Sequence, residues 1–218
     1  MKIPGKLLSV LLFASLFIMS SCVGKDSSMY GRIDGVLVNG RDAKVAKLYG
    51  YMPEYGKTVL LDSADVAGGR FYLSRRSGKE VGEAFVTLDD GEDAYCFLLS
   101  DSLLTMEIGQ NGYVVKGTAG NEALSTLIMK RQISVNERRR IQGVYADMQA
   151  DSTLTKAAED SLLDLYRRQS AGVRTEVLRV IDSNIDANRQ LSELAYRLFS
   201  YMLTQQQSDS IAGLLNLR

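Results

Sequence analysis

The sequence predicts an α+β protein: an antiparallel β-sandwich or barrel-like domain of about eight short strands, followed by an all-α segment of about four helices. Up to residue 117, short runs rich in Val, Leu, Tyr and Phe alternate with turn signals, as in antiparallel sheets. From residue 118, apolar residues recur at three- and four-residue spacings, as in amphipathic helices. Of the 218 residues, 45% are hydrophobic and 24% charged, which is ordinary for a soluble protein with a substantial core.

The first half contains eight runs that we expect to be strands. They are Tyr30–Leu37, Lys44–Tyr51, Thr58–Val66, Arg70–Ser74, Glu83–Leu88, Ala94–Leu99, Leu103–Ile108 and Gly112–Lys116. Turn signals between them are Asn39-Gly40, Gly68-Gly69, Asp89-Asp90-Gly91 and Asn111-Gly112. These residues tolerate positive φ and favour tight hairpins, so we expect an antiparallel meander in residues 30–117.

The second half, residues 118–218, predicts four helices. Their expected ranges are Asn121–Gln149, 154–185, Gln190–Leu203 and a last short helix that ends at Leu217. Asp151-Ser152 separates the first two, which we expect to form an antiparallel hairpin. Thr204 and Gln207 have the spacing of a capping box, in which each side chain satisfies a free backbone amide at the start of a helix.

Residues 1–21 have the pattern of a bacterial lipoprotein signal peptide. Lys2 and Lys6 precede an apolar run of 13 residues, Leu7 to Met19, which is too short to span a bilayer as a stable helix. Met19-Ser20-Ser21-Cys22 resembles the lipobox, in which the cysteine is acylated and becomes the mature N-terminus. An ordinary secretory signal with a chance cysteine is the alternative.

Lipidation of Cys22 with diacylglycerol and palmitate would anchor the protein in a membrane. One acyl chain binds only marginally, whereas two or three hold firmly, since each buried CH₂ contributes about 0.8 kcal/mol. Residues 22–29 then form a flexible tether, because Gly24 to Ser28 offer nothing to bury.

Composition excludes several function classes. The chain has no His, which removes Ser-His-Asp and Cys-His nucleophiles and His metal ligands. With 26 basic and 26 acidic residues it lacks the excess charge that nucleic-acid binding requires. If Cys22 is lipidated, Cys96 is the one remaining thiol, so a disulfide or CxxC motif within the chain is impossible. Apolar neighbours predict that Cys96 is buried and inert.

Several short motifs admit a chemical and a structural interpretation, and we favour the structural one for each. Asp62-Ser63 lacks a base for the serine and fits a polar pair at a strand bend. Asp89 to Asp93 offers carboxylates to Ca²⁺ but lacks EF-hand spacing, which favours a solvated hairpin. Arg138-Arg139-Arg140 would attract anions, yet three consecutive residues point in different directions around a helix.

Tyrosines in the first half suggest a second binding chemistry. Tyr49, Tyr51, Tyr55 and Tyr72 would stack sugars if they shared an exposed sheet face. Tyr is also a normal strand former, so the pattern equally fits structural positions.

Three segments resemble a known family. They are Tyr30-Gly31-Arg32-Ile33-Asp34-Gly35, the stretch Leu61 to Val66 followed by Gly69-Arg70-Phe71, and Val115 to Asn121. Together with 180–184 and 204–217, they are similar to the uncharacterised β-rich N-terminal domain and helical linker of Bacteroidetes-type lipoproteins. In that family the domain commonly precedes a thioredoxin-like thiol-disulfide interchange domain. No CxxC follows here, so the resemblance implies no redox activity for this sequence.

We expect a non-catalytic envelope lipoprotein that binds a partner, for which the resemblance suggests a separate thiol-disulfide oxidoreductase. The alternative is a carboxylate-dependent enzyme or binding module that acts on envelope glycans. Cys22 is the expected lipidation site, and we expect no catalytic residue, metal or cofactor. The resemblance implies that surface-exported members carry several acidic residues just after the lipidated cysteine. In this sequence, Val23 to Asp26 contains one acidic residue. The outer membrane, facing the periplasm, is therefore the expected location.

Overall fold

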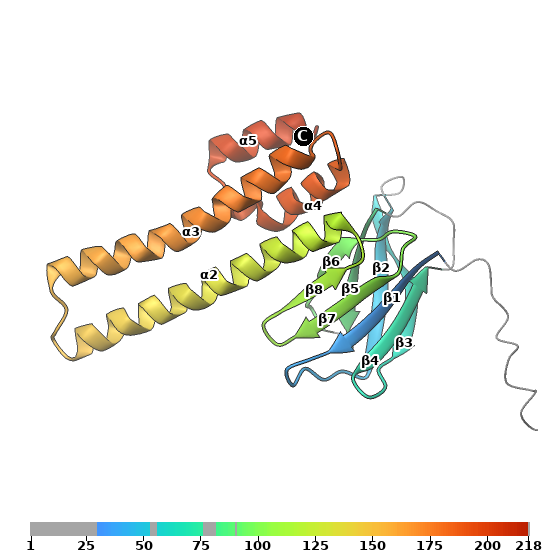
Figure 1. The fold of residues 1–218 in the computed structure, drawn as a ribbon, viewed down its shortest axis with the longest axis horizontal. Helices are drawn as coiled ribbons and strands as arrows, with labels where there is room; N and C mark the ends of the chain where they lie inside the picture. Colours follow the sequence, from blue (N-terminus) through green and yellow to red (C-terminus); the bar gives the residue numbers. More distant parts are fainter. Residues whose placement is uncertain (1–29, 53–55, 76–81, 90, 218) are drawn as a thin grey trace, which may run out of the picture.

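The computed structural model describes residues 30–52, 56–75, 82–89 and 91–217. It confirms the α+β class, with two four-stranded sheets followed by four α-helices (Figure 1). The strands are β1 (Tyr30–Leu37), β2 (Val45–Met52), β3 (Lys57–Asp65), β4 (Arg70–Arg75), β5 (Glu83–Leu88), β6 (Tyr95–Leu98), β7 (Leu104–Gly109) and β8 (Gly112–Lys116).

The prediction of an antiparallel meander is wrong. One sheet has the order β4-β1-β7-β8 and the other β3-β2-β5-β6, and β1 pairs with β7 in parallel. The connection at Asn39-Gly40 therefore crosses between sheets instead of closing a hairpin. Gly68 and Gly69, at φ 59° and 73°, do make a tight turn between Ala67 and Arg70, but the strands on either side enter different sheets. Two facing sheets bury both apolar faces, which a single flat meander leaves open.

The sheets enclose one apolar core. Alternate residues along each strand point inward, as the burial of Ala46, Leu48 and Met52 on β2 shows. Its largest fully buried side chains are Ile33, Leu48, Phe71, Leu73, Phe97, Leu104, Met106 and Ile108. Gly35 accommodates the Phe71 ring, since a Cβ there would lie 2.0 Å from it.

Side chains bridge the two open sides of the sandwich. On one side the Asp62 carboxylate of β3 accepts a hydrogen bond from the Ser74 amide of β4 at 2.8 Å. On the other, the Tyr113 hydroxyl of β8 donates to the Cys96 carbonyl of β6 at 2.7 Å. The sandwich is thus partly closed in the manner of a barrel.

The four α-helices are α2 (Ala119–Ala150), α3 (Lys156–Asn184), α4 (Arg189–Phe199) and α5 (Gln205–Leu214), with a 3₁₀ turn η2 (Ser200–Met202) after α4. The expected third helix therefore ends earlier than Leu203. The expected capping box is confirmed, because Gln207 N–H donates to the Thr204 hydroxyl and Thr204 N–H donates to the Gln207 side chain.

At the start of α2, Thr118 and Asn121 have different roles. Thr118 caps the helix, as its hydroxyl accepts from the Asn121 amide at 3.3 Å. The Asn121 side chain does not cap; it binds the backbone of Leu98 on β6. One turn later, the Ser125 hydroxyl donates to the Val115 carbonyl and accepts from its amide on β8. Helix α2 therefore covers an edge of each sheet.

A second apolar core lies between the helices and β6. Leu124, Leu127, Val177, Ile181 and Phe199 are among its buried side chains. Strand β6 contributes to both cores: Tyr95 and Phe97 face the sandwich, while Cys96 and Leu98 face the helices.

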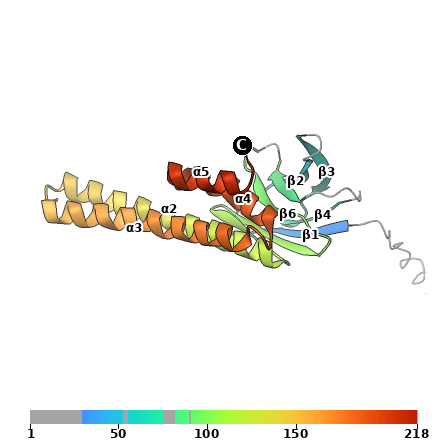
Figure 2. The same ribbon diagram turned by 90° about the horizontal axis from the view of Figure 1, so that it is seen from above.

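Helices α2 and α3 extend well beyond the rest of the molecule as an antiparallel pair (Figures 1 and 2). With 32 and 29 residues they are about 45 Å long at 1.5 Å per residue. Between residues 135 and 172 one side chain is buried, that of Ile141. We call this segment, residues 135–172, the arm.

Candidate functional site

Of the two cysteines, Cys22 lies outside the described residues, and Cys96 lies on β6 against the helical core, where it is half-buried and not fully buried as expected. Burial raises the pKa of the Cys96 thiol from 9.0 to about 11, with the nearby Glu83 carboxylate adding to the increase. The thiol therefore stays protonated near neutral pH. Since the thiolate is the nucleophile, the site disfavours disulfide exchange.

Acidic motifs have structural partners. Besides the Ser74 amide, Asp62 binds the Ser63 amide at 2.9 Å, next to a bulge in β3. The Asp89 carboxylate accepts from the Lys44 and Val45 amides, and these hydrogen bonds lower its pKa. Within the described part of the chain, no group of three or more His, Cys, Asp or Glu side chains is placed to hold a metal ion.

Tyr49, Tyr51 and Tyr72 do not share one sheet face. Tyr49 and Tyr51 lie on β2, where Tyr49 stacks on Phe85 at 5.1 Å. Tyr72 lies on β4 in the other sheet, 54% exposed, with the Arg32 guanidinium over its ring. Tyr55 falls outside the described residues. The interpretation that all four tyrosines form one sugar-stacking face is therefore wrong.

The three consecutive arginines point to different surroundings, as expected. Arg138 donates to the Ser170 hydroxyl on α3 and packs over the Tyr166 ring. Arg140 forms a two-point ion pair with Glu137. Arg139 lines a hollow beside the β domain.

That hollow is one of two that flank the tip of the β7–β8 hairpin, residues 109–113. The polar hollow has a volume of about 330 Å³ and lies between the tip, α2 and the loops before β2 and β6. Its charged residues are Arg41, Asp93 and Arg139, and Gln110, Asn111 and Gln132 supply amide groups. Arg41 pairs with Asp93 at 3.1 Å.

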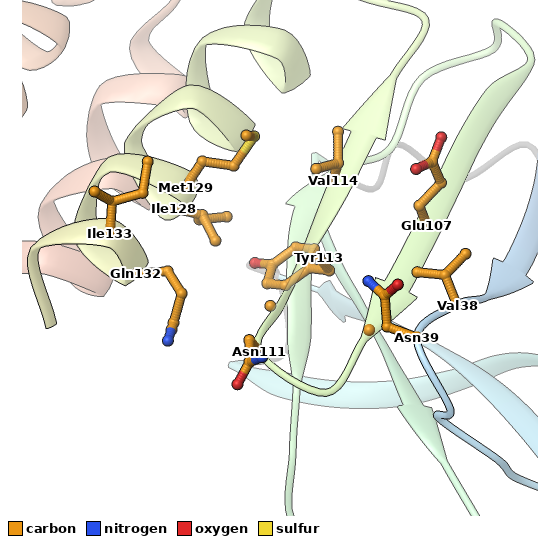
Figure 3. A pocket seen from close by; sticks show the side chains of 12 residues that line it. Val38, Asn39, Glu107, Asn111, Tyr113, Val114, Ile128, Met129, Gln132 and Ile133 are labelled. Atoms are coloured by element: carbon orange, nitrogen blue, oxygen red, sulfur yellow. The ribbon is translucent and has the colours of Figure 1, made fainter. Parts of the chain in front are cut away.

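The apolar hollow lies on the other side of the same tip and has a volume of about 270 Å³. Figure 3 shows Ile128, Met129 and Ile133 of α2 on one side, and Tyr113 and Val114 of β8 on the other. The one charged residue that lines it, Glu107, pairs with Lys116 at 3.5 Å. The two hollows share Gln132 and most of the tip among their lining residues, so they adjoin, and we treat them together as the candidate site.

Rigid elements position this candidate site. The Ser125 hydroxyl bonds to both backbone groups of Val115, which fixes α2 against β8. Gly112, at φ 150°, lets the chain turn at the hairpin tip. The Tyr113 hydroxyl donates to the Cys96 carbonyl, which holds the end of β8 nearest the tip against β6. Burial raises the pKa of the Tyr113 hydroxyl.

Sequence interpretation missed this site because four separate segments build it: residues 38–41, 93–95, 107–114 and 128–139. Each segment alone looks like a turn, strand or helix. The sequence singled out Arg138 to Arg140 and Asp89 to Asp93, but it did not indicate that Arg139 and Asp93 line the same hollow.

No family model, curated protein or solved structure matches this chain. In the described residues, no helix combines the length and apolar character needed to cross a membrane.

Proposed function

We propose that this chain is a lipid-anchored, non-catalytic binding protein of the cell envelope, and that the hollows beside the β7–β8 hairpin tip hold its partner. The observation that carries the proposal is that an apolar and a polar hollow adjoin at the same hairpin tip. Together they offer exposed apolar side chains, amides and guanidinium groups on a fixed framework.

The two acidic residues that line the hollows form ion pairs with basic side chains. Asp93 pairs with Arg41 and Glu107 with Lys116, so each carboxylate already has a structural counter-ion. Such pairing favours recognition over acid–base catalysis, in which one carboxyl group must hold a proton near neutral pH. This supports a binding role over the carboxylate-dependent enzyme.

The anchor would be an acylated Cys22, at the outer membrane and facing the periplasm. Strand β1 begins at the end of the molecule opposite the tip of the arm (Figure 1). A lipid on Cys22 would therefore attach the molecule through the end opposite the tip of the arm. If the partner is a thiol-disulfide oxidoreductase, the raised pKa of Cys96 favours surface contact over a mixed disulfide.

Two measurements test the proposal in cells. Cys22→Ala protein should lose incorporation of an alkyne-labelled fatty acid and be released from membranes, and unchanged retention would contradict the anchor. A photo-crosslinking residue in place of Gln132 should yield a covalent adduct, detected by mass spectrometry. The same residue in place of Gln205, exposed on α5, is the matched control. Equal adducts, or none, from the two positions would overturn the proposed binding site.

A further inference from the structure

Arg139 is an exposed guanidinium available to a ligand. It lines the polar hollow, and within the described part of the chain it has no ion pair or hydrogen bond. Its neighbours differ: Arg138 is engaged with Ser170 and Tyr166, and Arg140 with Glu137. The charge of Arg139 is therefore not used by the fold.

Arg41 provides a second guanidinium in the same hollow. One of its terminal nitrogens binds Asp93 at 3.1 Å. Its Nε is buried and has no hydrogen-bond partner among the described residues. The charged residues that line the polar hollow are thus two arginines and one aspartate, which leaves one positive charge in excess.

The adjoining hollow is apolar and open. Met129 and Ile133, one turn apart on α2, are 50% and 63% exposed. A cavity of about 150 Å³ binds benzene, so the apolar hollow, at about 270 Å³, has room for one large aliphatic or aromatic side chain.

We infer that the site binds an acidic peptide, with a large apolar side chain in the apolar hollow and a neighbouring carboxylate on Arg139 and Arg41. Guanidinium groups bind carboxylates through two parallel hydrogen bonds. The apolar hollow next to the charges favours a peptide over a glycan, whose surface is mostly polar. The carboxylate comes from an Asp or Glu side chain or from a chain end. This inference rests on the binding site proposed above and specifies its ligand.

The test uses lipidated full-length protein in detergent and three fluorescein-labelled probes, with fluorescence anisotropy as the readout. The probes are Gly-Ser-Gly-Ser-Leu-Phe with a free carboxylate, the same peptide amidated, and amidated Gly-Ser-Leu-Phe-Glu-Gly. Binding of the first alone assigns a chain-end carboxylate; binding of the third assigns a side-chain carboxylate. Failure of both the first and the third probe would overturn the inference, and so would equally tight binding of the amidated second probe, which has no carboxylate.

Matched variants locate the binding. Arg139→Gln should weaken binding about tenfold or more, the loss expected for one charge-assisted contact. Arg140→Gln makes the same change of charge one residue away and should leave binding unchanged. Ile133→Asp should weaken binding similarly, because it puts a charge in the apolar hollow. Equal binding by the Arg139→Gln and unsubstituted proteins would overturn the inference.

A fourth probe, a labelled oligogalacturonate, separates an acidic glycan from a peptide. If this probe binds in a way that depends on Arg139 but not on Ile133, the site is assigned to glycans and the inference of a peptide ligand is overturned. If the crosslinker at Gln132 captures a partner while these variants have no effect, the proposed binding site stands and only the ligand class fails.

Discussion

Asn121 satisfies both backbone groups of Leu98. Its side-chain oxygen accepts from the Leu98 amide and its nitrogen donates to the Leu98 carbonyl, each at 2.8 Å. Asn121 is fully buried, and β6 is an edge strand of its sheet. The asparagine therefore replaces a missing strand neighbour, and it ties the first turn of α2 to the β domain.

Replacing this side chain should destabilise the protein strongly. Asn121→Ala leaves an amide and a carbonyl of Leu98 without partners in a buried place, and each costs about 1–3 kcal/mol. We expect a loss of about 2–5 kcal/mol in the free energy of unfolding, measured by urea denaturation. Asn136→Ala, at an exposed position of the same helix, should cost far less. A similar loss in both variants would contradict this account.

The local fold was largely predictable, whereas the pairing of distant strands was not. Burial that alternates along β2, as in Ala46 and Leu48, follows directly from the period-two sequence pattern. The capping box at Thr204 also has a local signal. The parallel pairing of β1 with β7 has none, since residues 38–103 separate the two strands. The role of Asn121 has no local signal either, because its residue type suits a helix cap as well, whereas its side chain is buried and binds the backbone of Leu98.

The two cores should unfold in a single transition. Strand β6 carries Phe97 into the sandwich core and Leu98 into the helical core, so loss of either core removes support from the other. We expect Phe97→Ala, which costs about 3–5 kcal/mol, to lower the urea midpoints of tyrosine fluorescence and of helical circular dichroism together. Two separate midpoints in the variant would show that the halves fold independently.

Cys96 should make stability fall in alkaline solution. Its pKa is about 11 when folded, against 9.0 for an exposed thiol, so the folded state retains the proton more tightly. The contribution is complete below pH 9 and is lost as the pH rises from about 9 to 11; at 1.36 kcal/mol per pKa unit, its upper limit is about 3 kcal/mol. Cys96→Ala should have a flatter stability profile over this range. Parallel profiles for the two proteins would refute the assignment.

Glu176 should stabilise the contact between α2 and α3 above acidic pH. It pairs with Lys130 of α2 at 2.9 Å and with Arg179 at 2.7 Å, and hydrogen bonds to these cations lower its pKa to about 2. Since the folded pKa lies below the ordinary value of 4.5, the contribution is lost as the pH falls from about 5 to 2. Glu176→Gln should lower Tm at pH 7 and have little effect at pH 2.

The matched control for this pH series is Glu137→Gln. Glu137 pairs with Arg140 inside α2, so it does not join the two helices. Exposed ion pairs within one helix contribute little to stability, so we expect a smaller change in Tm. If the Glu176→Gln effect persisted unchanged at pH 2, its cause would not be the ion pair.

The arm should open more readily than the base of the same two helices. Its one buried side chain is Ile141, whereas Leu127, Val177 and Ile181 near the base are buried in the helical core. Local opening requires little free energy where few apolar contacts are lost. Amide hydrogen exchange at low protein concentration should therefore be faster at residues 144–149 and 157–163 than at 124–134 and 173–181. Equal protection would contradict the prediction, and protection of the arm that rises with protein concentration would show that a second copy covers it.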